Sequence, residues 1–190
     1  MNNSEYVLQR INNYFQRLSE EKHSMLLENV GSEYVSTSIE LITKLLNVIK
    51  DKEKDFTGKR FLDIGSGIGN MCGVANNMGL KAEGIELNPV LHDIAKAVYS
   101  EIQFHNIDIR DFNNYSDYDI IFYYCPFVTI ELQKELKQKI EDQAKIGAYI
   151  TMHSFGFEAI KDNRFINIYS NRNKEVHVWK KIGNNGYEKL

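Results

Sequence analysis

The stretch that decides the fold is FLDIGSGIGN, residues 61–70. A short apolar run that carries Asp63 opens into Gly65, Gly67 and Gly69, three glycines within five residues. Glycine permits positive φ and close approach of a ligand to the backbone, and the N-terminus of a following helix favours negative charge. The stretch therefore predicts a β-strand that passes into a nucleotide-binding turn, and it leaves open which nucleotide is bound.

Composition limits the class of protein. The 190 residues fit one domain with a small extension, and a hydrophobic fraction of 43% indicates a folded globular chain. The net charge of -3 gives no sign of a broad nucleic-acid surface. Cys72 and Cys125 are far apart, which favours a reducing compartment, and the histidines lack ligand spacing, so no metal is predicted. With no signal peptide and no apolar run of about 18 residues, we expect a cytoplasmic protein without a membrane span.

The order of elements predicts an α/β domain. Two amphipathic helices, 4–28 and 37–50, come first, and the second is predicted to start with Thr37 as the N-cap and Glu40 three residues later. Short β-like runs then alternate with helical ones, which is typical of a parallel sheet with crossover helices. The predicted strands are 60–64, 81–86, 102–108, 117–124 and 147–154, the helices between them are 68–78, 89–100 and 129–145, and a final antiparallel hairpin pairs 164–170 with 174–182. We divide the chain into a helical extension, 1–50, and a nucleotide-binding domain, 51–190.

Glu86 is the predicted ribose ligand. It closes the second strand, 21 residues after Gly65 (86 − 65), and a carboxylate there can accept both ribose hydroxyls. This holds for NAD and for S-adenosylmethionine alike. A P-loop is excluded, because no G-K-[ST] follows the glycines.

Further residues favour S-adenosylmethionine over a dinucleotide. Asn70 stands where the dinucleotide fingerprint has its third glycine. Asp63 is placed to reach a cationic amine, which a methionine group has and a pyrophosphate lacks. Asp108, with the backbone of Ile109, ends the third strand and could hydrogen-bond an adenine amino group. Because the sequence ends after a hairpin, we also expect no second mononucleotide half and no substrate domain of a dehydrogenase.

The sequence resembles the class I methyltransferases in four motifs: FLDIGSGIG, EGIELNP, NIDIRDF and DYDIIFYYCPF stand in the family's order over about residues 30–182. The resemblance implies a three-layer α/β sandwich preceded by N-terminal helices. Its seven-stranded, mostly parallel sheet has the order 3-2-1-4-5-7-6 and one antiparallel strand. It also implies S-adenosylmethionine as the cofactor. The implied cofactor-binding residues are Asp63, Gly65, Ser66 and Gly67 at the methionine end, Glu86 at the ribose, Leu87 beside the adenine, and Asp108 and Ile109 at the base.

A narrower resemblance concerns the acceptor. EYVSTSIELITKLL before the first strand is similar to Dot1-like and mitochondrial ATP-synthase-subunit lysine methyltransferases, which implies that Tyr34 and Thr37 line the methionine end. YYCPF, however, departs from the fourth motif of those enzymes and from the [DN]-P-P-[YF] of nucleic-acid amino methylation. We expect a protein amine as acceptor, then a small molecule, then nucleic acid. The alternative is a subunit that binds the cofactor without turnover.

Two side chains are candidates for the reaction itself. Tyr124 ends the fourth strand and is predicted to face the substrate and to line the cofactor site, whereas Tyr123 should point to the opposite face. His153 ends the fifth strand, and its imidazole could accept a proton near neutral pH. For Tyr124, packing alone is as simple an explanation as a place in the pocket wall, and for His153 a structural role is the simpler one. An acid such as Asp63 or Asp108 can also serve as a cap.

Overall fold

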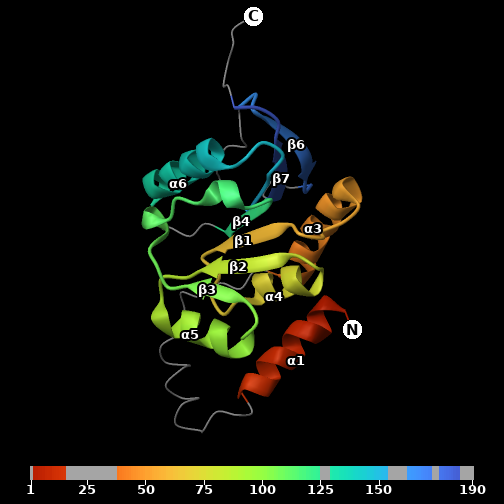
Figure 1. The fold of residues 1–190 in the computed structure, drawn as a ribbon, viewed down its shortest axis with the longest axis vertical. Helices are drawn as coiled ribbons and strands as arrows, with labels where there is room; N and C mark the ends of the chain where they lie inside the picture. Colours follow the sequence, from red (N-terminus) through yellow and green to blue (C-terminus); the bar gives the residue numbers. More distant parts are fainter. Residues whose placement is uncertain (1, 16–37, 125–128, 154–161, 173–175, 185–190) are drawn as a thin grey trace, which may run out of the picture.

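A seven-stranded sheet forms the centre of the protein (Figure 1). The computed structural model describes residues 2–15, 38–124, 129–153, 162–172 and 176–184. In chain order the strands are β1 (Arg60–Ile64), β2 (Lys81–Ile85), β3 (Gln103–His105), β4 (Ile120–Tyr124), β5 (Tyr149–His153), β6 (Phe165–Ser170) and β7 (Val176–Lys181). The sheet order is β3-β2-β1-β4-β5-β7-β6, with β1 to β5 parallel and β7 antiparallel to both of its neighbours. The predicted order and the terminal hairpin are confirmed.

Helices cover both faces of the sheet, which gives three layers. They are α1 (Asn3–Phe15), α3 (Ile39–Glu53), α4 (Asn70–Asn77), α5 (Pro89–Val98) and α6 (Ile130–Gln143), with 3-10 turns η1 (Ile109–Asp111) and η2 (Tyr115–Asp117). One core packs α1, α3, α4 and α5 against one face, and a second packs η1, η2 and α6 against the other. The crossover between β3 and β4 is thus short and turn-like, as its polar sequence predicted.

Alternation along the strands divides side chains between these two cores. In β1, Phe61 belongs to the core under α3 and α4, whereas Leu62 and Ile64 belong to the core under α6. In β4, Phe122 lies on the first side and Tyr123 on the second. Successive strand residues point to opposite faces, so neighbouring side chains of one strand can meet entirely different surroundings.

The beginning of α3 corrects one prediction. Ser38, not Thr37, is the N-cap, and its hydroxyl accepts a hydrogen bond from the amide of Leu41 at 3.4 Å. Two adjacent hydroxyl residues compete for this role, because either can satisfy an amide of the first turn. The apolar stripe of the helix was predicted correctly in its main part: Ile42, Leu45, Leu46 and Ile49 are buried.

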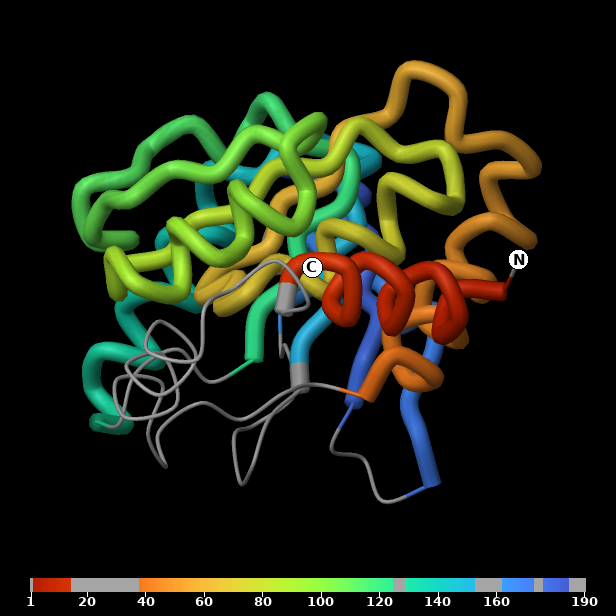
Figure 2. The backbone as a smooth tube through the Cα atoms, turned by 90° about the horizontal axis from the view of Figure 1, so that it is seen from below, coloured from red at the N-terminus to blue at the C-terminus, as the bar shows by residue number. Residues whose placement is uncertain are grey.

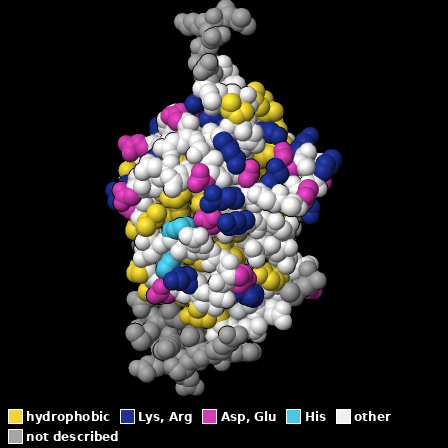
Figure 3. Space-filling model, viewed as in Figure 1, with side chains coloured by type: hydrophobic (Ala, Val, Ile, Leu, Met, Phe, Trp, Pro, Cys, Tyr) yellow, Lys and Arg dark blue, Asp and Glu magenta, His cyan; other side chains and the backbone are white. Residues whose placement is uncertain are grey.

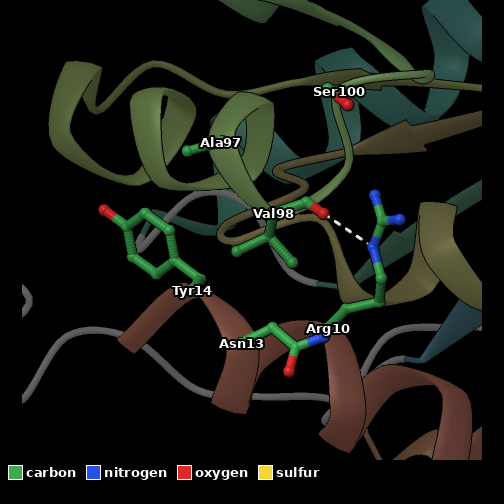
Figure 4. A pocket seen from close by; sticks show the side chains of 6 residues that line it. All are labelled: Arg10, Asn13, Tyr14, Ala97, Val98 and Ser100. Carbon is green, nitrogen blue, oxygen red and sulfur yellow. Dashed lines mark hydrogen bonds between the residues drawn. The ribbon is translucent and has the colours of Figure 1, made fainter. Parts of the chain in front are cut away.

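α1 packs beside α3, α4 and α5 on one side of the sheet (Figure 2). Arg10 ties it to the end of α5: its Nε donates to the carbonyl of Val98 at 2.7 Å, and its Nη2 pairs with Glu101 at 2.7 Å. Close by, the seam between the two helices leaves a pocket of about 150 Å³, toward which Tyr14 and Val98 point (Figure 4). The predicted helix 4–28 is confirmed up to Phe15, and its remainder lies outside the described residues.

Lys181 is an unusual core residue, because its amine is buried inside the protein. The residue is 1% exposed, and its Nζ donates to the carbonyls of Glu141, Asp142 and Ala144 at 2.8, 3.1 and 2.7 Å. These carbonyls lie at the C-terminal end of α6, where a positive charge is favourable. Lys181 therefore fastens α6 to the hairpin.

The described part of the chain contains no helix that is both long enough and apolar enough to cross a membrane.

Candidate cofactor site

The predicted cofactor residues gather at the carboxyl ends of β1, β2 and β3. β1 lies between β2 and β4, so the order of the sheet reverses there. Ligands of open parallel sheets bind at such a reversal, outside the carboxyl ends of the strands. The loops that follow β1, β2 and β3 bring Gly65, Glu86 and Asp108 to this one edge.

The turn after β1 has the backbone that its glycines require. Gly65, Gly67 and Gly69 have φ values of 75°, 54° and 83°, all in the left-handed region. Gly69 is needed for a second reason, because a Cβ there would lie 2.6 Å from Cζ of Phe104. The amides of Gly65 and Ser66 both donate to the carbonyl of Ile85 at 2.9 Å, which ties the turn to β2. The turn is thus held against the strand that carries the predicted ribose ligand.

Glu86 connects two of the loops at this edge. Its Oε2 accepts from the amide of Gly67 at 2.8 Å, and its Oε1 accepts from the amide of Asn88 at 2.8 Å. The residue is 9% exposed. Each carboxylate oxygen has two lone-pair positions, so both oxygens can still accept from a diol. The backbone contacts fix the carboxylate where the sequence predicted a ribose ligand.

Asp63 lies below the turn in the body of the protein. It is 2% exposed, and its described hydrogen bond comes from the thiol of Cys72, whose Sγ is 3.8 Å from Oδ2. Burial raises the pKa of Asp63 to about 8, the negative charge of Glu86 adds to this, and the thiol hydrogen bond opposes it. Neither cation nor backbone amide contacts this carboxyl group within the described residues.

Ser66 turns its side chain inward. It is 6% exposed, and its hydroxyl has no hydrogen-bond partner among the described residues. Its Oγ lies 2.7 Å from the point that a Cβ on Gly84 would occupy, so the two residues pack tightly. The hydroxyl of Ser66 is therefore placed against β2 beneath the turn.

The predicted adenine side of the site presents apolar surface. Leu87, the predicted neighbour of the base, is 63% exposed, and Ile107 at the end of the next strand is 38% exposed. Asn106 holds this loop in place, because its Nδ2 donates to the carbonyls of Glu86 and Leu87 at 2.8 and 3.0 Å. The sequence argument did not name Asn106, although an asparagine at the carboxyl end of a parallel strand was the available signal.

Asp108 has local partners of its own. It caps η1 by accepting from the amide of Arg110 at 2.8 Å, and its carboxylate pairs with the guanidinium of the same residue at 2.5 Å. The side-chain hydrogen bond from Arg110 lowers the pKa of Asp108, and the backbone hydrogen bond adds to this. Ile109 is buried in the core under α6. Both residues lie at the predicted edge, with the Asp108 carboxylate engaged by Arg110.

The two candidates for the reaction lie at adjacent strand ends. Tyr124 is half-buried at the end of β4 and packs on the α4 side, whereas Tyr123 is buried on the other side, as the alternation predicted. His153 ends β5 and is paired in register with Tyr124, although its side chain is not described. Tyr34 and Thr37 lie outside the described residues.

The arrangement fits a ligand that brings both a cation and a diol. A carboxyl group that is buried without a cation is costly, and a ligand ammonium group would offset that cost. Asp63 offers such a position, and Glu86 offers oriented acceptors for hydroxyl groups. The pocket between α1 and α5 is lined by none of these residues, so it is a separate feature.

Comparisons with known proteins agree with this geometry. A family model described as a methyltransferase domain matches residues 33–163, more than half of the chain. No curated protein matches. Similar solved structures include an RNA methyltransferase from Salinibacter ruber in complex with S-adenosyl-L-homocysteine, with 20% identity, a TM-score of 0.61 and coverage of 82% of this chain and 99% of that chain.

Another is a TehB-like SAM-dependent methyltransferase from Corynebacterium glutamicum, with 17% identity, a TM-score of 0.60 and coverage of 85% and 97%. A SAM-dependent methyltransferase from Geobacter sulfurreducens, in complex with S-adenosyl-L-homocysteine, has 19% identity, a TM-score of 0.52 and coverage of 66% and 53%. At these identities the structures establish the fold. The chain belongs to the methyltransferase-domain family and has the class I fold, whose members take S-adenosylmethionine as methyl donor.

Proposed function

We propose that this protein transfers the methyl group of S-adenosylmethionine to an amine, with a protein lysine as the acceptor. The cofactor's sulfonium supplies an electrophilic methyl group, so the protein has to align the acceptor nitrogen with it and exclude water. The observation that carries the cofactor half of the proposal is the fixed position of Glu86, held by the amides of Gly67 and Asn88 beside the buried Asp63.

Each part of the cofactor has a proposed place. Asp63 takes the amino group, and the left-handed glycines Gly65 and Gly67 let the methionine end approach the backbone. Glu86 takes the ribose hydroxyls, and Leu87 packs on the adenine. Asp108 and the backbone of Ile109 face the adenine edge, and Tyr34 and Thr37 line the methionine end. Ser66 contributes its backbone within the turn, because its hydroxyl points away toward Gly84.

We place the acceptor above the ends of β4 and β5. Tyr124 is half-buried there and forms one side of the acceptor position. An amine that arrives as ammonium must lose a proton before it can attack, and His153 at the neighbouring strand end is the proposed base. Neither role requires a metal ion.

Charge supports an acceptor other than nucleic acid. The net charge is -3, and acidic and basic side chains are interspersed over the face seen in Figure 3. Nucleic-acid binding draws on clustered Lys and Arg that neutralise phosphates. The resemblance of EYVSTSIELITKLL to lysine methyltransferases supports a protein amine, and a small-molecule acceptor is the alternative that the experiment has to separate.

Calorimetric titration with S-adenosylhomocysteine tests the cofactor site. Glu86→Ala should weaken binding about a hundredfold, because two hydrogen bonds to a charged acceptor are lost at about 1.5 kcal/mol each. Glu135→Ala removes an exposed acid from α6 and is the matched control, for which we expect unchanged affinity. Unchanged affinity in the Glu86 variant would show that the ribose is placed wrongly.

Incubation of the protein and a host lysate with cofactor labelled in the methyl group tests the acceptor. Label in a protein band that acid hydrolysis releases as methyl-lysine supports the proposal. Label confined to the small-molecule fraction supports the alternative acceptor. Tight binding with no transfer in either fraction indicates a subunit that only senses the cofactor, and the Glu86→Ala variant gives the background in all three cases.

A further inference from the structure

The described neighbours of Asp63 leave a charge on its carboxyl group uncompensated. In the sheet it stands between Gly84 of β2 and Phe122 of β4, neither of which can carry a charge. α4 contributes Cys72, and the loop after β2 contributes Glu86. These last two are the titratable groups that act on Asp63 within the described residues, and one of them is another acid.

The neighbours cannot stabilise an ionised carboxylate. The Cys72 thiol has one hydrogen and two acceptors in reach, Oδ2 of Asp63 at 3.8 Å and the carbonyl of Glu83 at 3.4 Å, so it is at most a weak donor to Asp63. Burial raises the pKa of that thiol well above its usual value, so it stays neutral. Glu86 is a second acid, and its two oxygens accept hydrogen bonds from backbone amides, so it offers Asp63 no positive charge. A second negative charge on Asp63, at 2% exposure, would be repelled by Glu86 and screened little by water.

We propose that Asp63 carries a proton in the unliganded protein and exchanges it for the cofactor's ammonium group, so that binding one cofactor releases one proton to solvent. This inference rests on the proposed function, because it needs the amino group at Asp63. The exchange balances: the carboxyl O–H bond breaks, its proton passes to a solvent base, and the ligand's ammonium keeps its own protons. Net charge at the position then stays the same, with an ion pair in place of a neutral acid.

The exchange makes cofactor affinity depend on pH. The pKa of Asp63 in the free protein, raised to about 8 by burial and then by Glu86, sets the upper limit of this range. Below it, each pH unit makes the proton about ten times harder to displace, so the Kd should rise about tenfold per unit as the pH falls. Above it, the acid is already ionised and affinity should level off.

Titration of the full-length protein with S-adenosylhomocysteine at about pH 6.5, in two buffers of different ionisation enthalpy, measures the released protons directly. The apparent enthalpy should differ between buffers by the value for nearly one proton per ligand. A second ligand, 5′-methylthioadenosine, has the nucleoside and the sulfur but lacks the amino group. Its binding should release none.

Two variants assign the proton. Asp63→Asn keeps the shape of a neutral acid without a proton to lose, so S-adenosylhomocysteine should bind with no release and a flat pH profile over the same range. Cys72→Ala removes the neighbouring thiol, and release should persist close to one proton per ligand. Loss of the release in Cys72→Ala would assign the proton to the thiol and overturn the proposal.

The wild-type measurement decides the question even where a variant fails to fold. Binding of S-adenosylhomocysteine with no proton release and a pH-independent Kd overturns the proton exchange while the cofactor site stands. Release of the same size with 5′-methylthioadenosine overturns it as well, because the amino group is then not involved. Failure of S-adenosylhomocysteine itself to bind would contradict the proposed function.

Discussion

Asp63 and Glu83 lie on neighbouring strands yet meet opposite surroundings. Glu83 is paired in register with Leu62, one residue before Asp63, and it faces the other side of the sheet. Its carboxylate receives hydrogen bonds from Arg60 at 2.7 Å, Tyr118 at 2.9 Å and His105 at 3.2 Å. Burial acts to raise the pKa of Glu83, but these partners outweigh it and lower the pKa, whereas that of Asp63 is raised.

The contrast between Glu83 and Asp63 shows where the protein provides a cation for a buried acid and where it does not. Away from the cofactor edge, buried or half-buried acids have a cation: Glu53 pairs with Lys180 and Lys59 at 2.9 Å each, and Glu141 pairs with Lys137 at 2.6 Å. At the cofactor edge the carboxyl group of Asp63 has none within the described residues. We infer that acids with a structural role have a cation within the protein, whereas Asp63, the proposed partner of the cofactor's amino group, has none among the described residues.

The largest expected effect is the pH dependence of the unfolding free energy at Asp63, and it tests the contrast with Glu83 directly. The raised pKa of Asp63 means that the native state holds a proton that the unfolded state has lost, so stability contributed by this group is present at low pH and falls as pH rises toward about 8. Asp63→Asn does not titrate. Its stability relative to wild type should therefore increase by about 1.4 kcal/mol per pH unit, or about 4 kcal/mol between about pH 5 and about pH 8.

Denaturant unfolding of both proteins across this range measures the difference. A constant gap at every pH would mean that Asp63 is ionised in the native state.

A smaller effect of opposite sense is expected at Glu83. Glu83→Gln leaves Arg60 without its closest partner, and because that guanidinium is partly exposed the loss should be about 2 kcal/mol, below the range for fully buried pairs. The lowered pKa makes this stability present above the usual carboxyl range and lost as pH falls through it. The unfolding free energies of the Glu83 variant and wild type should therefore converge in acid, and at higher pH the variant should be the less stable protein, opposite in sign to Asp63→Asn.

The smallest expected effect concerns the hydroxyl of Ser66, a buried group that carries no charge. Ser66→Ala removes a buried hydroxyl that has no partner among the described residues, so the protein should gain up to about 1 kcal/mol in unfolding free energy. Affinity for S-adenosylhomocysteine should stay within about twofold, because the side chain packs toward Gly84. A marked loss of affinity would instead place the hydroxyl on the cofactor.

Much of this edge could be predicted from sequence, because the residue types needed there are narrow. A left-handed turn against a ligand requires glycine, and Gly65, Gly67 and Gly69 all adopt positive φ. Asp63 and Glu86 could be placed because the ends of parallel strands meet at one edge. The sheet order followed from the motifs and the terminal hairpin, and the structure confirms it.

Other features depend on contacts that no local pattern records. Asn106 reaches back about twenty residues to the loop at Leu87, which is a product of strand order alone. Ser66 lies at a position of the cofactor motif, yet its hydroxyl points toward β2, where Gly84 has no side chain to block it. Asp108 suits both a cap and an adenine ligand, because a carboxylate serves either purpose. The shift of the α3 cap to Ser38 is of the same kind, since adjacent hydroxyl residues are locally equivalent.

The amine of Lys181 also bears on self-modification. If the protein methylates lysines, its own exposed amines are the nearest substrates, but every hydrogen on this Nζ is directed at a carbonyl of Glu141, Asp142 or Ala144. Added methyl groups would remove those donors and would have to fit inside the core. In mass spectra of the protein after prolonged incubation with cofactor, the Lys181 peptide should stay unmodified and serve as an internal standard for automethylation elsewhere.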